Sequence, residues 1–294
     1  MFNQLENFKK TSKTLKEASL TENKHSTLIE TYIFIFSYIA LMLILALVTL
    51  LLTDGIPAQS DSYVLLTLGA FIVTIFIALF VITKIEKRSL RGIGFSRENI
   101  VSSLVKGLIL GFGMFILVII IGMALGQYSF DGYDFSSINL ALPYILVFII
   151  QPFAEEIYTR GWIIPLFSKN YSVFIAICVS TLFFVVGHVG NNGFNIIAII
   201  NLILFSILFS LLFLKADNIW ICGALHSAWN FTQSYLMGFN VSGINTSSIA
   251  HFSQTTPNII NGGSFGPEAG LITSFIVILA IIFIWKIDLN KKIF

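Results

Sequence analysis

The sequence predicts an all-α, polytopic membrane protein with about eight transmembrane helices and both termini in the cytoplasm. Three observations lead to this prediction. Only 11% of the 294 residues are charged and 56% are hydrophobic, whereas soluble domains carry about 25% charged residues. The apolar residues fall in blocks long enough to cross a hydrocarbon core of about 30 Å, which takes about 20 helical residues. The basic residues fall in alternate connections between these blocks.

A polar N-terminal segment precedes the apolar blocks. Residues 1–29 hold five lysines and lack the apolar core of a secretory signal peptide, so we expect a cytoplasmic tail that is partly helical at most. Residues 30–294 then form a single membrane domain. The eight apolar blocks lie at about 31–53, 62–83, 104–126, 139–160, 171–188, 195–214, 219–238 and 269–286.

The positions of lysine and arginine orient these helices. Connections that carry positive charge stay on the cytoplasmic side of a membrane. With eight spans, all 17 basic residues fall on one side. The alternate connections near 54–61, 127–138, 189–194 and 239–268 carry none. We therefore expect a multi-pass protein of the cell membrane, and the many Phe, Ile, Asn and Lys residues favour a bacterial plasma membrane.

Composition also narrows the choice of partners. A formal net charge of +2 gives no polybasic surface, and no nucleic-acid-binding motif is present, so nucleic acid is not an expected partner. The lipid bilayer is the expected environment. Gly107 and Gly111 form a small-xxx-small pair, which predicts a close helix–helix contact rather than a chemical role.

Three apolar blocks contain ionisable side chains. Such residues cost about 2.5–3.5 kcal/mol each on membrane-insertion scales and therefore mark candidate functional sites. Glu156 and Arg160 are four residues apart on a helix and can pair, which leaves Glu155 without a partner in its own helix. His226 and Asn230 are also four apart and share a helix face. The candidate site residues are Glu155, Glu156, Arg160, His188, His226 and Asn230.

Each of these groups also has a structural explanation. The Glu156–Arg160 pair can serve as a buried packing contact. His188 can be an interfacial histidine, and His226 with Asn230 can form interhelical hydrogen bonds. All three groups together favour chemistry, because each carries its own insertion penalty and because two histidines, a carboxylate and an amide can activate water and stabilise an oxyanion. A proton-coupled transporter is disfavoured by the lack of an evident inverted repeat.

The same residues carry a family resemblance. Glu-Glu-x-x-x-Arg at 155–160, Phe-x-x-x-His at 184–188 and His-x-x-x-Asn at 226–230 occur in that order on apolar segments. They resemble the three motifs of the CPBP family, the CAAX proteases and bacteriocin-processing enzymes, also called Abi. The resemblance covers about 140–240. The Gly-Gly-Ser-Phe-Gly-Pro-Glu loop at 262–268 is similar to one in many bacterial members.

The resemblance implies an intramembrane endopeptidase with an eight-helix fold. Its substrate would be a membrane-associated or lipid-modified peptide or protein. By this resemblance, Glu155 is the general base that activates the attacking water, and His188 assists it. His226 and Asn230 stabilise the oxyanion.

The resemblance leaves the question of a metal open. Glu156 and Arg160 would hold the catalytic helix in position, and the family's glutamate-dependent description implies that no cofactor is needed. The rival assignment makes His188, His226 and a glutamate the ligands of zinc, because two histidines and a carboxylate form a legitimate catalytic zinc set. The alternative function is a non-catalytic bacteriocin self-immunity or membrane scaffold protein.

The depth of His188 conflicts with the depths of the other site residues. A rise of about 1.5 Å per residue places Glu155 and His226 in the cytoplasmic half of straight helices and His188 near the outer end of its helix. Two solutions are open. Either that helix begins later than residue 171, or the 189–194 connection dips into a polar cavity, where protein shields its backbone.

Overall fold

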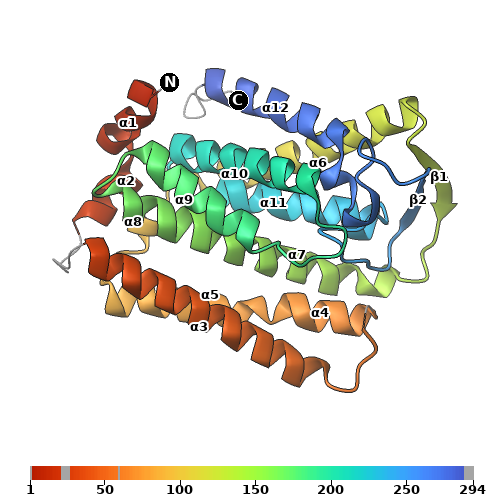
Figure 1. Cartoon of the computed structure of the whole chain (residues 1–294), viewed down its shortest axis with the longest axis horizontal. Coiled ribbons are helices and arrows are strands. Elements are labelled where there is room, and N and C mark those ends of the chain that lie inside the picture. The colour runs from red at the N-terminus through yellow and green to blue at the C-terminus, as the bar shows by residue number, and fades with distance from the viewer. Residues whose placement is uncertain (1, 21–26, 59, 288–294) are drawn as a thin grey trace.

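The computed structural model describes residues 2–20, 27–58 and 60–287, and these residues are mostly helical (Figure 1). The helices are α1 Phe2–Thr11, α2 Lys13–Ser19, α3 Thr27–Thr53, α4 Asp61–Gly69, α5 Phe71–Phe80, α6 Ile100–Ala124, α7 Ala141–Glu156, α8 Ile164–Ser168, α9 Val173–Val186, α10 Ile196–Ala216, α11 Trp220–Phe231 and α12 Leu271–Lys286. Segments of π-helix follow α5, α7 and α11, at Val81–Ile85, Ile157–Ile163 and Thr232–Leu236. Each of the eight apolar blocks of the sequence coincides with one of these helices or with a run of them.

Several of these helices can cross a membrane. In the described part of the chain, five are long and apolar enough to do so, namely Ile29–Thr53, Asp61–Ile85, Ile100–Ala124, Ile138–Ser168 and Ile196–Ala216. The apolar helices α9 and α12 are shorter. The chain is therefore a mostly helical, polytopic membrane protein, as its composition indicates. The number of eight spans and the cytoplasmic position of the termini stay predictions.

The mostly helical fold agrees with the all-α prediction, and it also contains a small two-stranded sheet that the sequence did not predict. Residues 128–133 and 250–254 form the strands β1 (Tyr128–Tyr133) and β2 (Ala250–Gln254), which pair antiparallel with a register shift between Phe130 and Gly132. The strands come from two of the connections that lack basic residues. Aromatic side chains stabilise the pairing, since Phe130 and Phe252 lie with their ring centres 5.2 Å apart across it.

The N-terminal segment is more structured than expected. Both α1 and α2 are helical, and Leu5 and Leu15 are buried in the main hydrophobic core. The Asp217 carboxylate at the end of α10 accepts a hydrogen bond of 3.0 Å from the backbone N–H of Thr14, and it pairs with Arg91. These contacts gather connections that carry basic residues at one end of the molecule, opposite the β1–β2 sheet (Figure 1). Lys24, Lys291 and Lys292 lie outside the described residues.

The helices form a core with an outer layer. Helices α7, α9, α10 and α11 lie centrally, and α3, α4 and α5 lie against one side of them (Figure 1). Helix α6 packs closely on α11, because a side chain at Gly107 would overlap the backbone oxygen of Ile221 and one at Gly111 would overlap that of Leu225. The predicted small-residue contact is thus present, and it fixes the helix that carries His226 and Asn230.

Candidate active site

The Glu-Glu motif lies at the end of α7. The helix continues directly into the π-helical segment Ile157–Ile163, which holds Arg160, and π-helical turns are frequent at functional sites. Glu156 and Arg160 are fully buried, and Glu156 Oε1 lies 3.2 Å from Arg160 Nη1. The guanidinium also lies 4.6 Å from the centre of the Phe184 ring. The pair expected from the sequence is therefore present, and an aromatic ring adds a cation–π contact.

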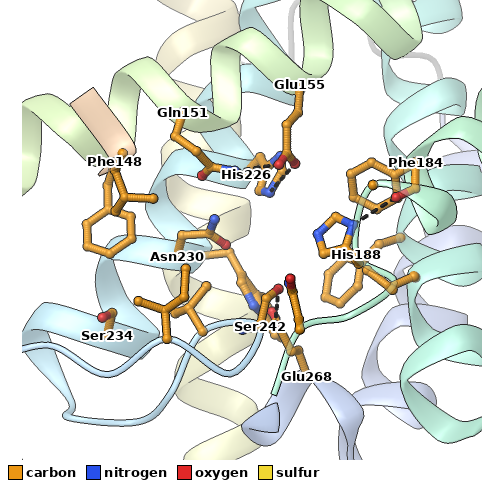
Figure 2. A pocket seen from close by; sticks show the side chains of 18 of the residues that line it. Phe148, Gln151, Glu155, Phe184, His188, His226, Asn230, Ser234, Ser242 and Glu268 are labelled. Atoms are coloured by element: carbon orange, nitrogen blue, oxygen red, sulfur yellow. Dashed lines mark hydrogen bonds and ion pairs between the residues drawn. The ribbon is translucent and has the colours of Figure 1, made fainter. Parts of the chain in front are cut away.

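His226 lies between the two glutamates. Its Nδ1 is 3.0 Å from Glu156 Oε1. Its Nε2 is 3.9 Å from Glu155 Oε2, and Figure 2 shows these two side chains next to each other. Because the ion-paired Glu156 carboxylate can only accept a hydrogen bond, the proton lies on Nδ1 and the Nε2 atom faces Glu155. The Phe209 ring stacks on the imidazole at a centre distance of 4.9 Å. Arg160, Glu156, His226 and Glu155 thus form a continuous buried chain.

Glu155 has one oxygen fixed and one oxygen free. Its Oε1 accepts a hydrogen bond of 2.5 Å from Gln151 Nε2, one helical turn earlier. Its Oε2 is buried and has no hydrogen-bond partner among the described residues. A buried carboxylate oxygen without a donor is costly unless water or a ligand supplies one. The free oxygen is therefore a suitable acceptor for the proton of a bound water molecule.

His188 reaches the same pocket from the turn that follows α9. The helix begins at Val173, close to the expected start, and ends at Val186, and His188 lines the same cavity as Glu155. The His188 Nδ1 lies 2.8 Å from the backbone oxygen of Phe184, to which it donates a hydrogen bond. This leaves Nε2 toward the pocket. From the 189–194 connection, Asn191 also lines this cavity, which favours the second of the two solutions.

The cavity joins the three motifs. It holds about 900 Å³ of empty space, including its open mouth, and Asn230 extends its side-chain amide into it one turn beyond His226 (Figure 2). Its walls come from α4, α5, α7, α9, α10, α11 and the loops around residues 188, 242 and 268. The lining residues are Thr67, Leu68, Phe71, Phe148, Gln151, Glu155, Phe184, Gly187, His188, Asn191, Leu202, Phe205, Phe209, His226, Trp229, Asn230, Ser234, Val241, Ser242, Ile244 and Glu268.

Sequence reasoning missed one charged residue of this cavity. Glu268 lies just before the last apolar block of the sequence, and its carboxylate lies in the cavity wall and accepts hydrogen bonds from the backbone N–H and the hydroxyl of Ser242, the latter at 2.6 Å (Figure 2). Burial raises the pKa of Glu268, although the Ser242 hydrogen bonds oppose this effect. One sequence signal was available, since Glu268 is the only acidic residue between 218 and 287.

A smaller side cavity meets the main one at Glu155 and His188. It holds about 390 Å³ of empty space and lies between α3 and α9. Its walls are largely aromatic, and the Tyr38 and Phe183 rings close it with their centres 5.1 Å apart. The reacting groups therefore lie next to an apolar recess on the side where α3 faces the bilayer.

The donor atoms do not converge as a metal site. Within the described residues, no group of three or more His, Cys, Asp or Glu side chains is placed to hold a metal ion. As arranged, these side chains do not fit the zinc set that the rival assignment requires.

The comparisons with known proteins agree with the motifs. Residues 137–232 match the family model described as Type II CAAX prenyl endopeptidase Rce1-like. This segment resembles the Rce1-like family. The match confirms the resemblance to CAAX proteases that the motifs predict, and it includes Glu155, His188, His226 and Asn230. Glu268 lies outside the Rce1-like segment. Searches of curated proteins and of solved structures found no match.

Proposed function

We propose that the protein is an intramembrane endopeptidase that hydrolyses a peptide bond in a membrane-associated or lipid-modified peptide, with a water molecule activated by Glu155. The observation that carries this proposal is the convergence of Glu155, His188, His226 and Asn230 on one cavity from α7, the turn after α9, and α11. The Rce1-like match over the same residues supports it.

The proposed reaction begins with water between Glu155 and His188. Glu155 Oε2 takes a proton from the water molecule while the water oxygen attacks the scissile carbonyl carbon. His188 Nε2 accepts a hydrogen bond from the second hydrogen of that water. General-base assistance of this kind contributes about 10²- to 10⁴-fold. Collapse of the tetrahedral intermediate breaks the C–N bond, and protonated Glu155 returns its proton to the leaving amine.

The α11 side of the cavity is suited to the oxyanion. The Asn230 amide can donate a hydrogen bond to the oxyanion. His226 can donate a second one from Nε2 once it takes up a second proton, with Glu156 accepting the hydrogen bond from Nδ1. Preorganised donors of this kind are worth most in a water-poor site. Glu156 and Arg160 act as positioning residues, because they touch His226 and the helix rather than the reacting atoms.

The orientation of the chain suggests from which side a substrate reaches the cavity. Two connections without basic residues, around 188–195 and 239–268, supply one wall of it. By the positive-inside rule these connections lie on the non-cytoplasmic face. A peptide at the outer surface of a cell membrane is therefore the proposed substrate, and peptide added outside intact spheroplasts should be cleaved faster than peptide enclosed within them.

The first test of the function is N-terminal proteomics on membranes that contain the wild type or Glu155→Gln at matched abundance. New peptide termini present only with the wild type support a protease and name its substrates. Identical profiles contradict the proposal and favour the immunity or scaffold function. A metal chelator in the same assay separates the glutamate-dependent mechanism from the zinc-dependent one. If the chelator abolishes cleavage and added zinc restores it, the mechanism is metal-dependent.

A further inference from the structure

The cavity contains a second carboxylate that the proposed reaction does not use. Glu268 is 7% exposed, and its Oε1 atom is held by the backbone N–H and hydroxyl of Ser242. Its Oε2 atom has no hydrogen-bond partner among the described residues. Figure 2 shows Glu268 and Glu155 on opposite sides of the cavity, with His188 and Asn230 between them. The unpartnered oxygen therefore faces the space that a substrate would occupy.

The segment that carries Glu268 is held firmly in place. Gly266 has a φ of +112°, and a side chain there would overlap the backbone oxygen of Asn240. The backbone N–H of Gly243 donates a hydrogen bond of 2.9 Å to the backbone oxygen of Phe265, which ties the two ends of the loop together beside Ser242. Such a fixed carboxylate can discriminate between ligands, because it cannot turn away to water.

The charges around the cavity are unbalanced. Its lining contains two carboxylates, two histidines and no lysine or arginine. The one nearby guanidinium, Arg160, is paired with Glu156 and lies against aromatic rings. A buried carboxylate that lacks a cationic partner is unfavourable. The electrostatic balance of the occupied cavity is therefore improved by a positive charge from the ligand.

We infer that Glu268 binds a positively charged nitrogen of the peptide substrate, either a lysine or arginine side chain or the peptide's own α-ammonium group. This inference rests on the proposed function, because it assigns the specificity of the same cavity. The cation would donate to Glu268 Oε2 while the scissile bond lies beside Glu155. The substrate class is then a peptide with a basic group close to the cleaved bond, in an otherwise apolar or aromatic context.

Binding of labelled peptides tests the inference without requiring cleavage. The probes are two pools of fluorescent ten-residue peptides that are acetylated at the N-terminus and amidated at the C-terminus. Their sequences are random except at a central position, which is lysine in one pool and norleucine in the other. A third pool has norleucine and a free N-terminus. Anisotropy is measured on the purified full chain in nanodiscs, for the wild type, Glu268→Gln and the exposed-carboxylate control Asp131→Asn.

The expected result is a preference of about 10- to 100-fold for a charged pool over the acetylated norleucine pool, the range of a charge-assisted hydrogen bond. The preference falls to near unity in Glu268→Gln and persists in Asp131→Asn. Preference for the lysine pool identifies a side-chain cation, and preference for the third pool identifies the α-ammonium group. Glu268→Lys should instead prefer a pool of the same design with a central glutamate. Binding of this glutamate pool by Glu268→Lys shows that the variant is folded.

Two results would overturn the inference. One is that the wild type binds the charged and neutral pools equally well, or binds none of them. The other is a cation preference that Glu268→Gln retains. Cleavage of the bound pools, followed by mass spectrometry, keeps the two proposals distinct. Preferential binding without any cleavage contradicts the endopeptidase and leaves the cation site standing, whereas cleavage without preference contradicts only the cation site.

Discussion

The cavity has two different walls. The helical wall, formed by Glu155, His226 and Asn230 on α7 and α11, is supported by a buried ion chain and by close helix packing. The loop wall, formed by Ser242 and Glu268, is supported by hydrogen bonds within one long connection. The difference indicates a division of roles. Under the two proposals, the base and the oxyanion donors lie on rigid helices, and the group that selects a ligand lies on a loop.

The largest effect is expected at the free carboxylate of the helical wall. Glu155→Gln keeps the shape of the side chain but removes the base, so kcat should fall about 10²- to 10⁴-fold with little change in KM. Steady-state cleavage of an identified peptide by the purified protein measures this. Full activity in this variant would show that the helical wall does not supply the base.

The next effect concerns the ion chain behind the helical wall. Arg160→Met leaves Glu156 buried without its guanidinium, which typically costs about 3–5 kcal/mol of stability. Thermal unfolding in detergent should show a clear drop in Tm. The double variant Arg160→Met with Glu156→Leu should recover much of this loss, and failure to recover would indicate that the pair does more than balance charge.

A smaller loss is expected at the amide of the same wall. Asn230→Ala removes one proposed oxyanion donor and should lower kcat about 10²- to 10³-fold, without the stability loss of Arg160→Met. Asn230→Asp is the matched variant, since it has the same size but a charge that repels an oxyanion. If Asn230→Ala left kcat unchanged and only raised KM, Asn230 would bind substrate rather than stabilise the oxyanion, and the roles of the two walls would need to be reassigned.

The smallest effect should come from pH at the loop wall. The buried Glu268 has a raised pKa, so it loses its charge on acidification at a higher pH than an exposed glutamate does. The preference for lysine over norleucine pools should therefore be full at high pH and decline as pH falls through that raised pKa. Glu155, His188 and His226 are ionisable and also face the cavity, so Glu268→Gln is the control. Its ratio of lysine-pool to norleucine-pool binding should not vary with pH.

The sequence was informative wherever the site follows a helical period. The spacing of Glu156 with Arg160 and of His226 with Asn230 is a property of an α-helix, so both juxtapositions could be predicted before the fold was known. The burial of ionisable groups in apolar blocks identified the helices that matter. The Gly107 and Gly111 spacing likewise predicted a close contact, although it could not show that the partner is α11.

The sequence was less informative about connections. Strands β1 and β2 pair across more than a hundred residues, and a two-stranded sheet leaves no strong periodic signal in short aromatic segments. The depth of His188 depends on where α9 ends and on what shields the loop after it. Neither fact is encoded by the apolar content of the segment.

By itself, the sequence determined the helical membrane architecture, the residues of the three motifs and the pairs that one helix can make, because hydrophobic length and helical period are local properties. Only the tertiary structure decided that His226 stands between Glu155 and Glu156, that His188 shares their cavity, and that Glu268 forms its opposite wall. The physical reason is that these contacts join segments far apart in the chain, and the packing of α6, α7 and α11 together with the hydrogen bonds of the 239–270 connection sets their distances.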